Sequence, residues 1–288
     1  VPARGAAPNV VLPASVSVSP TEVSKLLLPA GVLYDADSAR LRVQLSATSG
    51  SVLLSPAALD AVAQASGLAT VTVIGLVPSS ANSPANERVD NVNDSKTSTK
   101  YLNFDGAGSG LTLTLSAPEV VQQLRLTSRT NDDIWQWDPS SFEIYGANQD
   151  LAWRSTAWTK VAAGAVQLAN AKGSVYTASF ANTQAFQYYK VVFPTVKGVR
   201  NGQAFVHVSE VALLAPKLSV QQQGGVLTLN GDAKLITDLL TTDGHLRFDP
   251  GADGSRGQLT LVAEDGVNRV LRTVDLVEQE PFAIKATY

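Results

Sequence analysis

The sequence predicts an all-β protein made of two β-sandwiches. Residues 41–45 and 111–115 alternate apolar with polar side chains, which is the period of a strand buried on one face. Turn-forming pairs such as Asn201-Gly202 and Asp243-Gly244 recur between such segments. The aromatic residues are concentrated in the middle of the chain, where all four tryptophans lie between residues 81 and 215. Together these observations favour an aromatic-rich sandwich inserted into an aromatic-poor one.

Taken in order, the strands with the clearest alternation fall at residues 16–18, 41–45, 71–74, 111–115 and 259–262. Two segments predict short helices instead. Pro56 stands at a first-turn position of residues 55–65, and residues 232–240 allow two or three turns. We expect almost every other segment to be a strand or a turn.

The step in aromatic density divides the chain into three parts. Aromatic side chains often dominate cores and recognition surfaces, so the step marks a change of domain. Residues 1–77 and 216–288 are expected to form one split domain, because neither half has enough strands to close a sandwich alone. Residues 78–215 are expected to fold independently between them. In this scheme residues 71–74 and 226–229 share the core of the split domain.

The composition argues against several function classes. The net charge of −3 and the pI near 5.4 give no general attraction to nucleic acid or to an anionic membrane, and no apolar run is long enough to span a bilayer. Cysteine is absent, which excludes thiolate catalysis and the usual structural zinc and favours a bacterial source. The two histidines, His207 and His245, lie in different predicted domains, which argues against a catalytic triad. The lack of methionine and the linker-like start lead us to expect a piece of a longer chain.

The two flanks share features with one known kind of repeat. Tyr34-Asp-Ala-Asp-Ser is followed by an alternating strand, and residues 246–268 contain Asp249-Pro-Gly-Ala-Asp and Glu264-Asp-Gly. These stretches resemble the first and second halves of a cadherin-like or immunoglobulin-like repeat of large bacterial RTX-type adhesins. The resemblance implies a split β-sandwich at a bacterial cell surface, next to neighbouring repeats of the same long chain.

Three motifs occur in order in the central block: Asn91-Val-Asn-Asp-Ser-Lys-Thr-Ser-Thr-Lys-Tyr-Leu-Asn-Phe, Asp138-Pro-Ser-Ser-Phe-Glu-Ile-Tyr-Gly-Ala-Asn, and Tyr188-Tyr-Lys-Val-Val-Phe-Pro with Val208-Ser-Glu-Val-Ala-Leu-Leu. This block resembles a discoidin-type (coagulation factor V/VIII C-type) galactose-binding-like domain. The resemblance implies a jelly-roll β-sandwich with neighbouring termini that binds ligands through loops at one end.

Residues 94–99 form a polar loop that can wrap a hard cation, with a carboxylate, a hydroxyl five residues later and carbonyls between them. By resemblance, Ca²⁺ is expected to take side-chain oxygens of Asp94, Thr99 and Glu210 and carbonyls near Asn91 and Lys96. Ser95 stands where the family has glycine, which matters if this position needs a positive φ. Alternatively, Asp94 forms an Asx-turn with backbone amides.

A second acidic set lies in the flanks and consists of Asp35, Asp37, Asp249, Asp253, Glu264 and Asp265. In cadherin-like repeats such residues gather Ca²⁺ at the ends of domains. The resemblance therefore implies calcium ligands at Asp35, Asp37 and Asp265. The alternative is that these carboxylates only decorate turns of an acidic protein.

The main candidate for ligand binding is the loop of residues 129–139. Trp135 and Trp137 cannot both point inward if this polar segment is extended, but both can be exposed in a loop. A ring beside planar polar groups is the usual way to bind a sugar or a peptide. The residues expected to contact the ligand are Trp135, Trp137, Arg129, Asn131, Asp132 and Asp133, with Arg200 and Asn201 on a neighbouring loop.

Purely structural roles are the alternative for the residues of this region. One tryptophan can plug the end of the sandwich while Asp132 and Asp133 cap turns, and residues 200–202 can be an ordinary solvated hairpin turn. By resemblance to the discoidin-type family, Trp158 is expected in the core, and Trp153 is left open. His207 is expected to be a half-exposed strand residue rather than a ligand.

The leading functional hypothesis is a non-catalytic, ligand-binding region of a bacterial surface adhesin. Its ligand would be a glycan or a peptide on another cell or in the matrix, and calcium would stiffen loops and domain junctions. One alternative is a spacer or docking module without a small ligand, and another is an accessory carbohydrate-binding domain of a secreted enzyme. The adjacent Asp132 and Asp133 diverge in an extended segment, unlike the paired carboxylates of a glycosidase. No nucleic-acid contact and no membrane insertion are expected.

Overall fold

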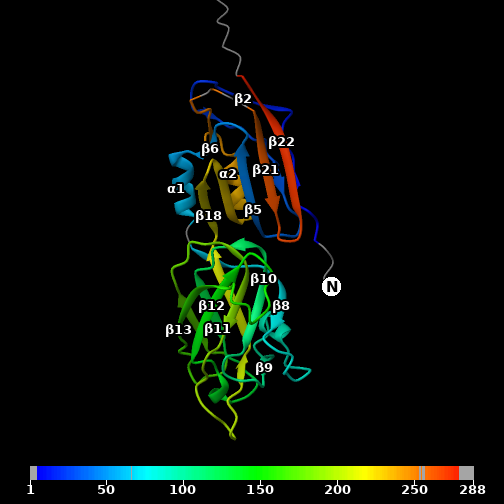
Figure 1. Ribbon diagram of the computed structural model, residues 1–288, viewed down its shortest axis with the longest axis vertical. Helices are drawn as coiled ribbons and strands as arrows, with labels where there is room; N and C mark the ends of the chain where they lie inside the picture. Colours follow the sequence, from blue (N-terminus) through cyan, green and yellow to red (C-terminus); the bar gives the residue numbers. More distant parts are fainter. Residues whose placement is uncertain (1–4, 66, 253, 255–256, 279–288) are drawn as a thin grey trace, which may run out of the picture. The chain divides into compact units, whose positions relative to one another are not determined.

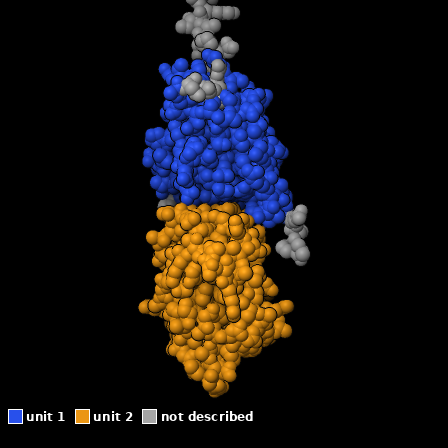
Figure 2. Space-filling view, viewed as in Figure 1, with its two compact units in different colours: residues 1–66, 217–288 blue, residues 67–216 orange. Residues whose placement is uncertain are grey.

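The computed structural model describes residues 5–65, 67–252, 254 and 257–278 (Figure 1). The chain divides into two compact units, residues 1–66 with 217–288 (unit 1) and residues 67–216 (unit 2) (Figure 2). Strands dominate both units, and the only α-helices among the described residues are two short ones in unit 1. The predicted all-β sandwich class is confirmed.

Unit 1 contains two main sheets. The larger has six strands, in the order β18 (Leu218–Gln223), β19 (Val226–Asp232), β5 (Arg40–Ala47), β21 (Gln258–Glu264), β22 (Arg269–Glu278) and β2 (Ser15–Val18). The smaller has three, in the order β3 (Ser24–Lys25), β20 (Leu246–Asp249) and β6 (Ser51–Leu54). The short strands β1 (Asn9–Val10) and β4 (Leu33–Tyr34) pair separately.

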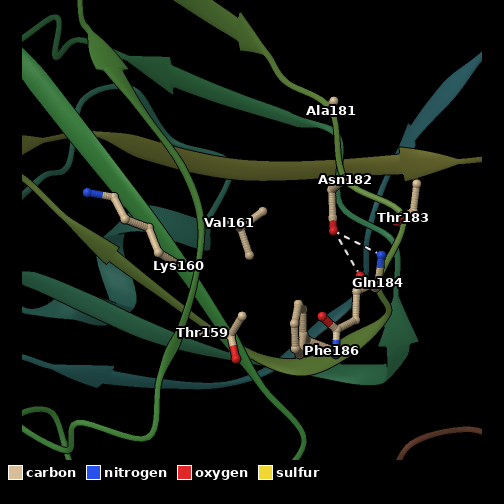
Figure 3. A pocket seen from close by; sticks show the side chains of 8 residues that line it. All are labelled: Thr159, Lys160, Val161, Ala181, Asn182, Thr183, Gln184 and Phe186. Atoms are coloured by element: carbon tan, nitrogen blue, oxygen red, sulfur yellow. Dashed lines mark hydrogen bonds between the residues drawn. The ribbon is translucent and has the colours of Figure 1, made fainter.

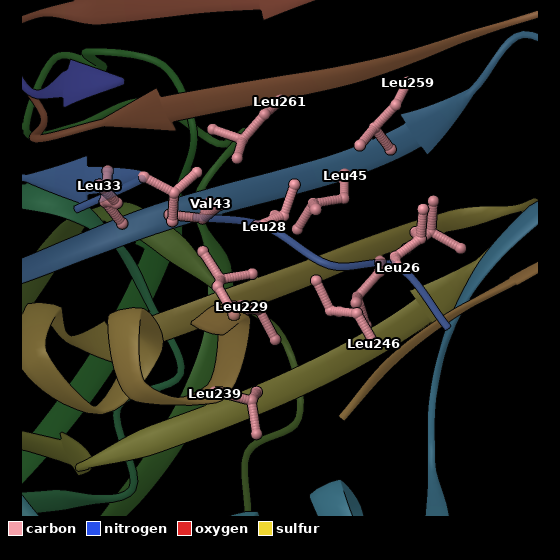
Figure 4. Packing of buried hydrophobic residues seen from close by; sticks show 14 of the residues in the cluster. Leu26, Leu28, Leu33, Val43, Leu45, Leu229, Leu239, Leu246, Leu259 and Leu261 are labelled. Atoms are coloured by element: carbon pink, nitrogen blue, oxygen red, sulfur yellow. The ribbon is translucent and has the colours of Figure 1, made fainter. Parts of the chain in front are cut away.

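The two separate chain segments of unit 1 share the six-stranded sheet. Strand β5, from the first segment, lies between β19 and β21 of the second segment, so that Leu45 is opposite both Leu227 and Leu261. Residues from both segments then meet in one core, where Val43 packs in the same cluster as Leu229 and Leu261 (Figure 4). The unit therefore depends on both segments for its sheet and for its core.

Two capped helices complete unit 1, and both were predicted from the sequence. Helix α1 (Pro56–Gln64) begins after Ser55, whose hydroxyl accepts a hydrogen bond from the Ala58 amide at 3.2 Å. Helix α2 (Ala233–Thr241) begins after Asp232, whose carboxylate accepts from the amides of Lys234 and Leu235 at 2.9 and 3.1 Å. The buried face of α2 adds Ile236, Leu239 and Leu240 to the core.

Unit 2 is a sandwich of two antiparallel sheets. One sheet has the order β13 (Thr159–Ala165), β12 (Ser141–Ala147), β15 (Phe186–Val192), β10 (Gly110–Glu119) and β8 (Val73–Pro78). The other has the order β14 (Val175–Ser179), β11 (Gln123–Thr127), β17 (Glu210–Pro216) and β7 (Leu68–Thr70). Buried residues such as Leu113 and Ile144 from the first sheet share one core with Leu126 and Leu213 from the second.

The boundary between the units lies earlier than the sequence indicated. Residues 67–78 contribute β7 and β8 to the two sheets of unit 2, and Val71 belongs to the core of that unit. Residues 71–74 therefore do not share a core with Leu227 and Leu229, which lie in unit 1. Leu68 is paired with Pro216, so unit 2 starts and ends on neighbouring strands.

Candidate functional site

A row of three aromatic side chains lies where several loops of unit 2 meet. The Phe104 and Phe205 rings are 4.8 Å apart between centroids, and the Phe205 and Trp137 rings are 4.9 Å apart. Phe104 is 38% exposed, and the other two rings are half-buried. We call these three residues the aromatic ridge. Phe104 directly follows β9 (Tyr101–Asn103), Phe205 ends the loop before β16 (Val206–Val208), and Trp137 belongs to the loop of residues 129–138.

The two tryptophans of this loop lie on the 3₁₀ turn η2 (Trp135–Trp137), and both are half-buried. The indole N–H of Trp137 donates to the Gln203 carbonyl at 3.0 Å, and its ring also packs edge-on against His207 at 5.8 Å. Trp135 covers the Arg129 guanidinium, 5.1 Å from the ring centroid. Each ring thus has an internal partner and still presents part of its surface to solvent.

Beneath the loop lies a cluster of buried charges centred on Asp138. This carboxylate is 1% exposed and accepts from Arg129 at 2.8 Å, from Lys197 at 3.0 Å and from the His207 ring at 3.1 Å. The Arg129 side chain is fully buried and also pairs with Asp132. Arg129 is therefore placed to support the loop from inside rather than to meet a ligand directly.

Asp132 joins the same cluster from the other side. Its carboxylate accepts from Lys100 at 2.6 Å and from the Ile134 amide at 3.0 Å. Partial burial acts to raise the pKa of Asp132, but the hydrogen bonds from Lys100, the Ile134 amide and Arg129 outweigh it and hold that pKa well below its usual range. The turn-capping alternative is thus realised at this residue.

His207 is fully buried, so the expectation of a half-exposed strand residue is wrong. Strand β16 pairs with β9, and the loop of residues 129–138 covers the imidazole. Burial lowers the pKa of His207, with the hydrogen bond to Asp138 as the main opposing effect and nearby Arg129 and Lys100 acting in the same direction as burial.

The remaining predicted ligand residues are at the surface. Asn131 and Asp133 are exposed on the loop, with Asp133 3.5 Å from Lys172. Arg200 and Asn201 are exposed on a hairpin tip that closes through two backbone hydrogen bonds between Arg200 and Gln203, at 2.9 and 3.0 Å. Because Gln203 is also the acceptor for Trp137, this tip is fixed against the aromatic ridge.

The loop of residues 94–99 places several oxygens close together. Asp94 accepts from the Lys96 amide and from the Thr99 hydroxyl, both at 2.8 Å, and that hydroxyl also lies 2.8 Å from the Lys96 carbonyl. Ser95 has a φ of 62°, so the loop keeps the left-handed position without a glycine. The Asn91 side-chain amide donates hydrogen bonds to the carbonyls of Asn86 and Lys100, at 2.9 and 2.8 Å.

Glu210 faces this loop from β17 and has an unsatisfied oxygen. Its Oε1 is buried without a hydrogen-bond partner. Burial, together with the nearby Asp94 carboxylate, raises the pKa of Glu210 to about 6. Two carboxylates are therefore close together without a positive charge between them.

In unit 1, the predicted acidic residues lie on turns around one backbone segment. Asp35 accepts from the amides of Asp37 and Ser38 at 3.1 and 2.8 Å, and Asp37 accepts from the Ala6 amide at 2.8 Å. Asp265 is 3% exposed and accepts from the Val267 amide at 2.8 Å. Its neighbour Asn268 donates to the Gly5 carbonyl at 3.1 Å, so both turns contact residues 5–6. Of the other acidic candidates, Asp253 lies outside the described residues.

The other two tryptophans surround a buried lysine on the outer face of the five-stranded sheet. The Lys190 ammonium lies 4.4, 5.4 and 5.2 Å from the ring centroids of Tyr145, Trp153 and Trp158, and it donates to the Trp153 carbonyl at 3.2 Å. Burial lowers the pKa of Lys190. Trp158 is 7% exposed and so is buried as expected, but it packs against Lys190 rather than in the core cluster between the two sheets, and Trp153 is half-buried over the lysine.

A small pocket of about 260 Å³ lies elsewhere in unit 2, between Thr159–Val161 and residues 181–186 (Figure 3). The Asn182 side chain is held by the backbone of Gln184, through bonds of 3.0 Å in both directions. Both polar ends of the Asn182 side-chain amide are thus used within the wall of the pocket.

In the described part of the chain, no three or more His, Cys, Asp or Glu side chains are arranged to hold a metal ion. No helix of that part is long and apolar enough to cross a membrane.

Comparisons with known proteins give structural likenesses only. No family model matches the sequence, and no curated protein matches it. Among solved structures, the family 32 carbohydrate-binding module of Clostridium perfringens NanJ, in complex with galactose, is 17% identical over 51% of this chain and 99% of its own, with a TM-score of 0.41. Two such modules of Clostridium perfringens ZmpB, in complex with GalNAc, are 15% identical over 59% and 42%, with a TM-score of 0.43.

An F5/8 type C domain from Bacteroides fragilis is 13% identical over 59% of this chain and 98% of its own, with a TM-score of 0.37. The galactose and the GalNAc are ligands of those proteins. For this chain, any proposal of a ligand rests on the geometry of the aromatic ridge and of its neighbouring loops.

Sequence reasoning missed two residues of the site, Phe104 and Phe205. Phe104 ends the first motif of the central block, and Phe205 follows the Arg200 hairpin by five positions. Nothing in the spacing indicates that the two rings meet, because their contact depends on the pairing of β9 with β16. An isolated phenylalanine beside a strand is also the common pattern of a core residue.

Proposed function

We propose that unit 2 is a non-catalytic domain that binds a glycan on the aromatic ridge. The supporting observation is the row of Phe104, Phe205 and Trp137 rings, partly exposed and fixed in place before any ligand arrives. Sugar rings present apolar C–H faces that pack on aromatic rings, while nearby planar polar groups bond their hydroxyls. A ridge that is already rigid loses little conformational entropy on binding.

The polar partners for such a ligand lie on the hairpin tip. Arg200 and Asn201 are exposed, and the tip that carries them is bonded to Trp137 through Gln203. Arg200 forms no ion pair among the described residues. Its guanidinium is thus free to donate to ligand oxygens beside the ridge, in keeping with the expectation from the sequence.

A glycan array followed by titration of the best glycan tests this proposal on the full chain. Phe104→Ala and Trp137→Ala are expected to weaken binding at least tenfold, about 1.4 kcal/mol. Leu59→Ala removes a 52% exposed side chain from α1 of unit 1 and serves as the matched control, with unchanged affinity. Circular dichroism checks that each variant is folded. Equal affinity of all three variants and the wild type would rule out the ridge as the site.

Calcium binding by the loop of residues 94–99 is part of the proposal. The residues fit a hard cation: the uncompensated Glu210 oxygen and the Asp94 carboxylate are close together, with the Thr99 hydroxyl and the Lys96 carbonyl in the same loop. Bound Ca²⁺ would neutralise the two carboxylates and stiffen the loop. Added Ca²⁺ is expected to raise the melting temperature of the chelator-treated protein, and the rise should vanish in Glu210→Gln. An equal rise in that variant would contradict the site.

We propose the same ion for the turns of unit 1, with Asp35, Asp37 and Asp265 as ligands that the ion itself would draw together, since these residues form no ready cluster without it. Its support is that Asp35 Oδ2 is buried without a hydrogen-bond partner, and that both acidic turns contact residues 5–6. The wider setting is also a proposal: an extracellular adhesin on a bacterial surface, with neighbouring repeats of the same chain as partners. The cysteine-free composition and the two-segment construction of unit 1 support it.

A second candidate function rests on one observation. Trp135 and Trp137 both have internal partners, which is also what a rigid spacer or protein-docking module requires. In that case no glycan of the array would bind, and Phe104→Ala would change only the binding of a protein partner.

A further inference from the structure

A separate hollow lies on the outer face of the four-stranded sheet of unit 2. Its volume is about 610 Å³, within the usual range for small-molecule sites. Its floor is built in register from neighbouring strands: Arg125 of β11 is opposite Ala212 of β17, and Thr127 is opposite Glu210. The loop of residues 93–97 and Gly173 form its sides. We call this hollow the sheet groove.

Small side chains make the groove deep. Ala212 lies on the floor beside Arg125, and Gly173 forms part of one wall with a φ of 66°. A Cβ at Gly173 would come within 3.3 Å of the Thr130 methyl group, so a larger residue would be strained there and would also narrow the hollow.

The walls are held by hydrogen bonds to the first two residues of the 129–138 loop. The Thr97 carbonyl accepts from the amide and the hydroxyl of Thr130, at 2.8 and 3.0 Å. On the other side, the Gly173 amide donates to the Arg129 carbonyl at 3.1 Å. Both walls are thus fixed, and the groove exists before any ligand binds.

Arg125 supplies unused hydrogen-bond donors at one end of the groove. Its only side-chain hydrogen bond among the described residues is a long one of 3.3 Å from Nη2 to the Thr70 hydroxyl. It forms no ion pair with any described carboxylate. A half-buried guanidinium without a counter-charge is well suited to a planar anion that it can hold through two parallel bonds.

Glu210 supplies an unused acceptor toward the other end. Its Oε1 is buried and bonds to no donor, and it does not pair with Arg125 although the two share the floor. Thr127 is opposite Glu210 on the floor and two residues along β11 from Arg125. No aromatic ring lines this groove, in contrast to the aromatic ridge.

From this arrangement we infer that the sheet groove is a second binding site, for an acidic saccharide unit such as a uronic acid. The carboxylate of the sugar pairs with Arg125, and its hydroxyls donate to the Glu210 carboxylate and bond to the Thr127 hydroxyl. The donor end and the acceptor end match a molecule with a carboxylate at one end and hydroxyls along the rest. This site does not depend on the ridge, so either can fail without the other. It shares Glu210 with the proposed calcium site, so the sugar hydroxyls bond to that carboxylate when the loop of residues 94–99 holds no cation.

NMR titration of the ¹⁵N-labelled full chain, in chelator-treated buffer, tests the inference. The probes are D-glucuronate, D-galacturonate and uncharged D-glucose. Either uronate is expected to shift the amides of Thr127, Val175 and Ala212, whereas glucose at equal concentration leaves them in place. Arg125→Gln should weaken uronate binding at least tenfold. Arg154→Gln, which removes an exposed arginine elsewhere in unit 2, should leave it unchanged.

Trp137→Ala separates the two sites: it should weaken glycan binding at the ridge at least tenfold and leave the groove shifts intact. If Arg125→Gln does not fold, Arg125→Lys replaces it, since lysine keeps the positive charge but cannot form a bidentate pair with a carboxylate. The inference is overturned if neither uronate shifts the groove amides, if glucose shifts them equally, or if both arginine variants bind uronate like the wild type.

Discussion

At the scale of single residues, Asp138 determines how the ridge loops are held. One buried carboxylate contacts three cationic or polar side chains from separate segments: Arg129, Lys197 and His207. A buried charge cluster is weak evidence for net stability, but removing one member leaves the others desolvated and unpaired. The cluster therefore fixes a geometry rather than adding a simple increment of stability.

Asp138→Ala is expected to lower the free energy of unfolding by about 3–5 kcal/mol, because it leaves the buried Arg129 without its main counter-charge. Asp133→Ala is the matched control in the same loop. Its carboxylate is 71% exposed, so we expect a change within about 0.5 kcal/mol. Denaturant titration measures both. A small effect of Asp138→Ala would show that the cluster is not closed in solution.

His207 gives a pH dependence with a definite sign. The pKa of His207 in the folded protein lies below the ordinary value of 6.5. Well above pH 6.5 the ring is therefore neutral in both the folded and the unfolded chain, and it does not reduce the free energy of unfolding. As the pH falls below 6.5, the unfolded chain takes up a proton that the folded chain does not. Stability then declines by up to about 1.4 kcal/mol per pH unit until the folded pKa is reached.

The measurement compares denaturant unfolding of the wild type and of His207→Gln between pH 7.5 and pH 5. The groups facing the ring, Asp138, Arg129 and Lys100, remain in both proteins, so the difference between the two curves isolates the histidine. The variant should show the shallower decline. Parallel curves would mean that the imidazole is accessible to protons in the folded protein.

The sequence predicted these residues only in part. A polar run with two tryptophans marks the 129–138 loop, and Asn201-Gly202 marks the hairpin turn. Sequence order does not show that Lys197 and His207 converge on Asp138 from 59 and 69 positions away. The burial of Arg129 follows from that convergence, and so could not be foreseen from the loop alone.

At the scale of elements, the helices show how local signals suffice when the partner is close in sequence. The Ser55 side chain caps α1 by accepting one hydrogen bond from a backbone amide, whereas the Asp232 side chain caps α2 by accepting two. We expect Ser55→Ala to cost about 1 kcal/mol and Asp232→Ala up to about 2 kcal/mol, since α2 also carries three buried core residues. Thermal unfolding of both variants tests the order, and a larger loss for Ser55→Ala would contradict it.

Strands were predictable by type but not by sheet. Alternation identified residues 41–45, 111–115 and 259–262, all of which lie in strands. It could not assign residues 71–74, because a strand has the same period whichever core it faces. Their place was decided by the pairing of β8 with β10 and of β7 with β17.

At the scale of the whole molecule, the insertion of unit 2 depends on two sets of strand pairs. Strand β5 takes both its neighbours from the second segment of unit 1, which closes that sheet across the interruption. Leu68 and Pro216 are paired where unit 2 begins and ends, so the two ends of the inserted unit lie on neighbouring strands. Domains with neighbouring termini tolerate this kind of insertion well.

This construction predicts that each unit folds without the other. Residues 67–216 expressed alone, and residues 1–66 joined to 217–288 by a short Gly-Ser linker, should each give a dispersed NMR spectrum and a cooperative thermal transition. Residues 1–66 alone should stay unfolded, because β5 then lacks both β19 and β21 and its apolar face has no core to join. If the joined halves failed to fold while residues 67–216 folded alone, unit 1 would depend on unit 2 for its stability. The split-domain interpretation would then have to be replaced by a single cooperative fold.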